Sequence, residues 1–157
     1  MKNFNKTICC CMLLVLSSMM LMACGVLEVR GKSFEYESVS IDWGMAEDED
    51  KTAIFEEFLV SNETELLNVL KTRNSRNQRV TTFGTDGKYT TVNGENEILD
   101  SGYYKQDDDV ITLADTEEGL TQDGTFTLKA NEKGYKVSDV LNSDLSVFAV
   151  YQYVVSE

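Results

Sequence analysis

The pattern of apolar and polar positions divides the chain into one apolar run near its start and a long remainder of alternating character. The run covers residues 8–23, follows a short segment with two lysines, and ends at the small residue Ala23. A positive start, an apolar stretch of this length and a small final residue are typical of a secretory signal. A transmembrane helix needs about 20 apolar residues, so a retained N-terminal anchor helix is the weaker alternative. We therefore expect residues 1–23 to be a signal peptide.

The first segment after the signal that alternates like a strand is 33–43. Its alternation changes phase close to Ser38. The apolar residues before the change are Phe34 and Tyr36, and those after it are Val39, Ile41 and Trp43. A β-bulge or sharp bend near Ser38 would bring both sets onto one face. A long first strand that bends is also what a closing barrel requires.

Two segments with helical periodicity follow this strand. Residues 51–59 carry apolar side chains at helical spacing, and Asn62-Glu63-Thr64-Glu65 resembles a capping box that opens a second short helix. The apolar stripes are Ile54, Phe55, Phe58 and Leu59 in the first helix, and Leu66, Leu67, Val69 and Leu70 in the second. The polar residues 74–78 end the second helix. We expect a helical insert over 46–72 whose stripes pack into a core.

From Arg79 onward the pattern changes to short alternating strands separated by turns rich in glycine or aspartate. The expected strands are 79–83, 88–92, 99–106, 110–114, 125–130, 135–141 and 146–155. Regular short strands of this kind favour a meander closed into a barrel or a sandwich. We favour the barrel, because a bent first strand and a last strand with apolar residues on both faces can pair. The prediction is a mainly β domain, 31–157, with about eight antiparallel strands in a closed barrel and a helical insert after the first strand.

The charge balance excludes several classes of function. The signal holds two of the 14 basic residues, Lys2 and Lys6, and none of the 27 acidic ones, so the remainder has 12 basic and 27 acidic residues and a net charge of −15. Nucleic acids and anionic lipid surfaces both require basic patches, so we expect neither as an electrostatic partner. We expect the domain to be a monomer that its charge keeps apart from its neighbours.

The residue types that usually perform catalysis are scarce. The sequence has no histidine, which removes Ser-His and Cys-His nucleophile pairs and histidine metal sites. A hydrolase that uses two carboxylates and a Ser-Lys nucleophile remain as enzymatic alternatives, but the sequence singles out no residues for either. We expect neither an enzyme nor a cofactor.

The end of the apolar run carries a more specific signal. Cys9, Cys10 and Cys11 lie within the run, so Cys24 is the one thiol that follows it. Leu21-Met22-Ala23-Cys24 resembles the lipobox of bacterial lipoproteins. The resemblance implies that the Cys24 thiol receives a diacylglycerol, that the chain is cut before it, and that acyl chains hold residues 24–30 to the outer side of the cell membrane as a short tether. The alternative is an ordinary secretory signal followed by an incidental cysteine.

Several short motifs of the expected strands carry a second resemblance. They are Gly31-Lys32-Ser33-Phe34, the hairpin Phe83-Gly84-Thr85-Asp86-Gly87-Lys88-Tyr89, Gly102-Tyr103-Tyr104, and Asp109-Val110-Ile111-Thr112-Leu113. Together they resemble the small lipocalin-like lipoproteins of Gram-positive bacteria, over most of residues 31–155. The resemblance implies a lipocalin-like barrel. Most proteins of this kind have no assigned activity, so it implies no particular ligand.

Aromatic residues are the candidates for a ligand site. An eight-stranded barrel is just wide enough to hold one small ligand or to be filled by its own side chains. Tyr36, Trp43, Tyr89, Tyr103, Tyr104, Tyr135, Tyr151 and Tyr153 could line such a cavity. We single out Tyr36, Trp43, Tyr89, Tyr103 and Tyr151. The interpretation that we favour for these residues is nevertheless a filled core with tyrosine hydroxyls at its rim.

The acidic clusters at 47–50 and 107–109 could in principle bind calcium, but neither has the spacing of a calcium loop. We interpret both as solvated turns and expect no metal site. Two hypotheses for function remain. The first is a surface-anchored binding module for a small apolar ligand. The second is an interaction protein that uses its acidic surface or helical insert to engage an envelope or extracellular protein.

Overall fold

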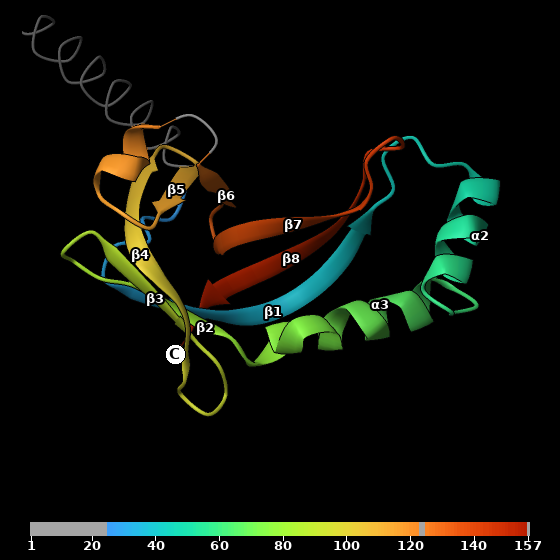
Figure 1. Ribbon diagram of the computed structural model, residues 1–157, viewed down its shortest axis with the longest axis horizontal. Helices are drawn as coiled ribbons and strands as arrows, with labels where there is room; N and C mark the ends of the chain where they lie inside the picture. The colour runs from blue at the N-terminus through green and yellow to red at the C-terminus, as the bar shows by residue number, and fades with distance from the viewer. Residues whose placement is uncertain (1–24, 123–124, 157) are drawn as a thin grey trace, which may run out of the picture.

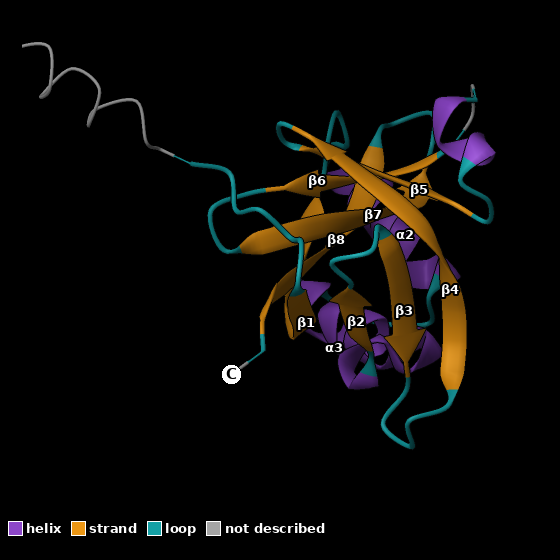
Figure 2. Cartoon of the chain, turned by 90° about the vertical axis from the view of Figure 1, so that its left-hand side faces the viewer, coloured by secondary structure: helices purple, strands orange, loops and turns teal. Residues whose placement is uncertain are grey.

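The computed structural model describes residues 25–122 and 125–156, and these form a closed antiparallel barrel of eight strands (Figures 1 and 2). Each strand pairs with the next along the chain, and the last pairs with the first. The strands are β1 (Lys32–Asp42), β2 (Val80–Phe83), β3 (Lys88–Val92), β4 (Ile98–Asp107), β5 (Val110–Ala114), β6 (Phe126–Ala130), β7 (Gly134–Asn142) and β8 (Val147–Val155). The expected closed antiparallel barrel with a helical insert after its first strand is confirmed.

The bulge expected near Ser38 is present in β1 and determines how the barrel closes. Tyr36 is opposite Tyr153 and Ser38 is opposite Gln152, so β1 contains one more residue than β8 at this point. Glu37 and Ser38 are both exposed. Because the extra residue resets the alternation, the apolar side chains on both sides of the bulge face the barrel interior.

The insert between β1 and β2 consists of α2 (Asp48–Glu57), α3 (Glu63–Thr72) and a short 3-10 helix, η1 (Arg73–Gln78). The Asn62 side chain accepts a hydrogen bond of 3.0 Å from the backbone N–H of Glu65, as the capping motif predicted. Helix α3 lies along β1, and α2 lies beyond the far ends of β1, β7 and β8 (Figure 1). Leu66 and Leu70 of α3 are fully buried, so the insert belongs to the core.

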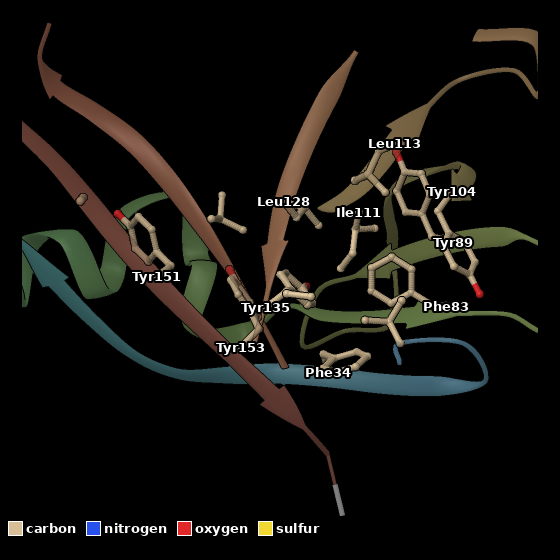
Figure 3. Close-up of a cluster of buried hydrophobic side chains, with 14 of the residues drawn as sticks. Phe34, Phe83, Tyr89, Tyr104, Ile111, Leu113, Leu128, Tyr135, Tyr151 and Tyr153 are labelled. Atoms are coloured by element: carbon tan, nitrogen blue, oxygen red, sulfur yellow. The ribbon is translucent and has the colours of Figure 1, made fainter. Parts of the chain in front are cut away.

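A cluster of aromatic rings fills the centre of the barrel (Figure 3). The Phe34 ring packs edge-on against Phe83 and Tyr135, with centroid distances of 5.7 and 5.3 Å. The rings of Tyr135 and Tyr153 are stacked at 5.0 Å. Such pairs contribute about 0.5–1.5 kcal/mol each beyond the burial of their area. These rings therefore fill the barrel interior on the side that faces the N-terminal segment.

The N-terminal segment seals one end of the barrel. Val29 is fully buried, and its N–H donates to the Gln106 side chain at 2.9 Å. The Gln106 amide donates to the carbonyl of Leu27 at 3.1 Å, and the Leu27 N–H donates to the carbonyl of Asn131 at 2.9 Å. We call this end of the barrel the tether end, and the opposite end, where β1 ends and β2 begins, the insert end.

The sealing segment overlaps the tether expected at 24–30. Because Leu27 and Val29 are bound to the barrel, the expected tether is not extended along its whole length, and the barrel begins only a few residues after Cys24. Cys24 and the expected signal peptide lie outside the described residues. Among the residues that are described, no helix is long and apolar enough to cross a membrane.

The last strand, β8, carries apolar residues on both faces. Its inward residues, Val147, Ala149, Tyr151 and Tyr153, are buried. Its outward residues Phe148, Val150 and Val154 are only half-buried. Helix α3 packs on the inner side, because the Tyr151 hydroxyl donates to the carbonyl of Leu70 at 3.3 Å. The inner face of β8 is thus covered by the barrel along one part and by the insert along the rest.

Gly134 provides a test of the closing strand pairs. A Cβ at this position would lie 2.1 Å from the backbone oxygen of Tyr153, across the pairing of β7 with β8. We expect Gly134→Ala to lower the free energy of unfolding by about 1–3 kcal/mol, because the strand must shift to admit the methyl group. Gly25→Ala is the matched control, since nothing lies within 4 Å of its Cβ. Urea unfolding followed by circular dichroism measures both, and equal stability of the two variants would contradict this account of the β7–β8 pairing.

Candidate functional site

A cavity of about 430 Å³ lies within the insert end of the barrel. Its size falls within the range of about 300–1,000 Å³ that is usual for small-molecule sites. Its wall contains residues from η1 and from β2 to β8: Arg76, Arg79, Thr81, Tyr89, Thr91, Leu99, Asp100, Leu113, Phe126, Leu128, Tyr135, Val137, Asp139 and Tyr153. The cavity is therefore bounded by the aromatic cluster below and by the insert on one side.

The pairing of β6 with β7 explains why the barrel is hollow here. These strands share only two residue pairs, Lys129 with Lys136 and Ala130 with Tyr135, both at the tether end. Beyond these pairs the two strands are no longer matched residue by residue, so side chains rather than the sheet form the wall toward the insert end. Phe126 of β6 is 56% exposed and Leu99 of β4 is 46% exposed, although both line the cavity. The mouth thus has an apolar rim.

An ion pair crosses the cavity wall from η1 to β7. Arg76 Nη2 donates to both carboxylate oxygens of Asp139, at 2.8 and 2.7 Å. The two side chains are 15% and 27% exposed. Burial alone would lower the pKa of Arg76, but the charge of Asp139 raises it. The net effect is a raised pKa of the Arg76 guanidinium. The Arg76 guanidinium also lies over the Tyr151 ring, 4.7 Å from its centroid.

Hydroxyl groups supply most of the other polar atoms of the wall. The hydroxyls of Thr81 and Thr91 share a hydrogen bond of 2.9 Å. The Tyr89 hydroxyl donates to Asp100 at 3.0 Å. Burial raises the pKa of Tyr153, and the nearby charges of Arg76 and Arg79 offset part of this increase. The wall therefore joins apolar side chains to a set of hydrogen-bond donors.

Three tyrosines of the cavity are held in the neutral form. Burial raises the pKa of Tyr89, and its hydrogen bond to Asp100 raises it further. Burial is also the main reason why the pKa of Tyr135 and the pKa of Tyr153 are raised. These hydroxyls therefore remain protonated at neutral pH.

Of the five aromatic residues singled out from the sequence, Tyr89 lines the cavity and the other four do not. Tyr36 is half-buried against Tyr153, with ring centroids 6.3 Å apart. Tyr151 faces inward, but α3 occupies the space in front of it, and in Figure 3 it stands apart from the other labelled tyrosines, beside the helix. Both residues therefore make packing contacts outside this cavity.

Trp43 and Tyr103 also lie outside this cavity. Trp43 lies just beyond β1, packs edge-on against Phe55 at 5.8 Å, and donates its indole N–H to Glu63 at 3.3 Å. These contacts of Trp43 pack the insert against the barrel. Tyr103 points to the barrel exterior, where the Lys88 ammonium lies 5.5 Å from its ring centroid. Its neighbour Tyr104 takes the inward position, since adjacent strand residues face opposite sides.

The sequence analysis did not single out Arg76 or Arg79. It interpreted the segment around Arg76 as a break between the insert and the next strand. A weak signal was present, because three of the four arginines of the chain, Arg73, Arg76 and Arg79, recur at three-residue spacing in this segment. Their relevance depends on the barrel, which turns the start of β2 and the end of β7 toward one cavity.

The two acidic clusters have local roles. Asp50 accepts a hydrogen bond of 2.9 Å from the Glu47 N–H at the start of α2, and its charge there suits the helix dipole. Asp109 lies 3.3 Å from Lys129, across the pairing of β5 with β6. No group of three or more potential metal ligands converges anywhere in residues 25–122 and 125–156.

A comparison with protein-family models found no match, and searches of curated proteins and of solved structures found no significant match either.

The raised tyrosine pKa values predict how stability depends on alkaline pH. Tyr135 keeps its proton in the folded state above its ordinary pKa of 10.0, whereas the unfolded chain loses it there. The contribution is therefore fully present below about pH 10 and is lost as the pH rises further. We expect the free energy of unfolding to fall between about pH 9 and about pH 11, and to fall less steeply in Tyr135→Phe. Urea unfolding at several pH values measures this, with Tyr103→Phe as the matched loss of a hydroxyl. A slope as steep in Tyr135→Phe as in the unmodified protein would contradict it.

Proposed function

We propose that the protein is a membrane-anchored, extracytoplasmic lipoprotein of lipocalin-like type that holds a small, largely apolar ligand in the cavity at the insert end. The observation that carries the proposal is a cavity of about 430 Å³ with tyrosines in its wall and an apolar rim. A barrel filled by its own side chains would instead have supported a purely structural role for the tyrosines.

The exposed rim strengthens this proposal. Leaving Phe126 and Leu99 in water is unfavourable, at about 25 cal/mol for each Å² of apolar surface. A ligand in the mouth would cover these side chains together with Leu113 and Leu128, which lie deeper in the wall. Burial of apolar surface on both partners is the main source of affinity in sites of this kind.

The position of the cavity relative to the expected anchor is also informative. The N-terminal segment is bound to the tether end, and the cavity lies at the insert end. Lipidation of Cys24 would hold the tether end next to the membrane, so the cavity mouth would face away from it. We infer that the ligand arrives from the medium or the cell wall.

Filling the cavity tests the binding function. Thr91 lines the cavity, whereas Thr90 lies on the opposite face of β3. We expect Thr91→Phe to weaken binding of the neutral probe N-phenyl-1-naphthylamine by about tenfold, or about 1.4 kcal/mol, because the ring occupies the ligand's space. Thr90→Phe adds the same ring outside the cavity and is expected to bind like the unmodified protein. A fluorescence titration of residues 25–157 measures this, and failure of the unmodified protein to bind the probe would contradict the proposal.

Replacing Cys24 tests the anchor. We expect Cys24→Ser to abolish lipid attachment, so that the protein moves from the membrane fraction to the culture medium and its processed length changes, because acyl chains contribute about 0.8 kcal/mol of membrane binding per buried CH₂. Cell fractionation with immunoblotting, and the intact mass of the mature protein, measure the outcome. Persistence of the variant in the membrane at the same mature length would show that the lipoprotein proposal is wrong.

The second candidate function, binding of an envelope or extracellular protein, is favoured by one feature of the insert. Leu59, at the end of α2, is 93% exposed and has a positive φ of 56°, a conformation that costs a leucine energy. Met45, near the start of the insert, is also exposed. Native mass spectrometry of the protein from its own cells distinguishes the candidates, because a retained small molecule supports the cavity and a retained polypeptide supports the insert.

A further inference from the structure

We infer that the ligand is an anionic amphiphile, whose acidic head group is bound by Arg79 and Arg76 while its hydrocarbon part lies against the apolar wall. This inference rests on the proposed binding function and adds the chemical class of the ligand. Its starting point is that two guanidinium groups line the cavity of a protein that is otherwise strongly acidic.

The charges of the wall differ from those of the rest of the protein. The cavity is lined by two arginines and two aspartates, Asp100 and Asp139. Without these four, the 12 basic and 27 acidic residues that follow the signal become 10 and 25. The wall therefore has one basic residue for each acidic one, whereas the remainder has fewer than one for every two. The lining of the cavity thus lacks the excess of negative charge that the rest of the protein carries and that would repel an anion.

The local backbone places both arginines on one side. Arg79 N–H donates to the carbonyl of Arg76 at 3.2 Å, which is the i to i+3 hydrogen bond of a 3-10 turn. Side chains three residues apart in such a turn lie one above the other. Arg76 and Arg79 therefore project together from η1 and the start of β2. Guanidinium groups in this arrangement suit the oxygens of a carboxylate or phosphate.

The carboxylates of the wall already accept hydrogen bonds from the protein. Asp139 accepts two from Arg76, and Asp100 accepts one from the Tyr89 hydroxyl. A cationic ligand would have to compete with these donors. The tyrosine and threonine hydroxyls near the arginines can instead donate to an acidic head group, and burial keeps the tyrosines protonated. The polar side of the wall is thus rich in donors.

The apolar side of the wall comes from different strands. Leu99, Leu113, Phe126 and Leu128 belong to β4, β5 and β6, whereas Arg76 belongs to η1 and Arg79 lies between η1 and β2. One part of the wall can therefore hold a charged head while another part covers a hydrocarbon chain. A ligand that has both parts uses the whole cavity, whereas a purely apolar ligand would contact only the apolar side of the wall.

Octanoate, octanol and octylammonium share one hydrocarbon chain and differ in head group, so they test the inference. The mature protein, purified from membranes into phosphatidylcholine nanodiscs, is titrated by calorimetry, and the signal of nanodiscs without protein is subtracted. We expect octanoate to bind more tightly than octanol, and octylammonium to bind least. This comparison requires no variant. An octylammonium affinity equal to or above that of octanoate would overturn the inference.

Arg79→Gln locates the head group. We expect it to weaken octanoate binding by about tenfold or more, because a hydrogen-bonded charge is lost, and to leave octanol binding unchanged. Arg79→Lys should retain part of the octanoate affinity. Arg73→Gln is the matched control, because Arg73 is exposed over the Phe58 ring and lies outside the cavity. Its loss should change octanoate affinity by no more than about twofold, since salt screens its long-range charge effect at physiological ionic strength. Equal losses in Arg73→Gln and Arg79→Gln, or none in Arg79→Gln, would overturn the inference.

Two further outcomes distinguish a failure of the anionic-ligand inference from a failure of the proposed binding function. If octanol binds and the head group has no effect, the anionic ligand is wrong and the binding function stands. If none of the three compounds binds, the binding function fails as well. Repeating the octanoate titration in nanodiscs that contain phosphatidylglycerol distinguishes the sources of the amphiphile, because competition by this anionic lipid indicates a membrane lipid and its absence indicates a soluble acid.

Discussion

The antiparallel pairing of β1 with β8 is the contact on which the rest of the structure depends. It joins the first and last strands of the barrel over eight residue pairs, and no edge strand remains exposed where it forms. The pairing requires β1 to keep its apolar side chains inward over eleven residues while the barrel curves. The bulge at Glu37 meets this requirement, because it bends the strand and resets the alternation at one point. Without it, Val39 and Ile41 would face solvent.

The same closure creates the space for a site. Strands β1, β7 and β8 are long, whereas β2, β3, β5 and β6 are short, so the insert end cannot be covered by strands alone. Helix α3 and η1 cover part of the exposed inner face, with Leu70 against Tyr151. The remaining part, between η1 and the weakly paired β6, is the cavity. Hence the insert has two roles. It completes the core of the long strands, and it contributes Arg76 to the wall.

The sequence was sufficient to predict those features that depend on local pattern. The bulge could be inferred from a change of phase, the second helix from its cap at Asn62, and the strands 88–92 and 110–114 from alternation between turns. What a pattern could not provide is the direction of a side chain whose partner is distant. Of the adjacent Tyr103 and Tyr104, only one can face the interior, and the choice is set by the register with β3 and β5. Trp43 continues the inward phase of β1, but it lies past the end of the strand and meets the insert instead.

The arginines illustrate the same limit more sharply. In the sequence, Arg76 belongs to a polar connection and Arg79 opens the expected strand 79–83, and neither position by itself indicates a ligand site. Asp139 is separated from Arg76 by 63 positions, and the ion pair exists only because β7 lies across the barrel from η1. A partly buried pair of this kind is weak evidence for stability, since the cost of desolvating two charges offsets much of their attraction. An apolar pair could fill the same volume, and the proposed anionic ligand would account for the presence of charges at this position.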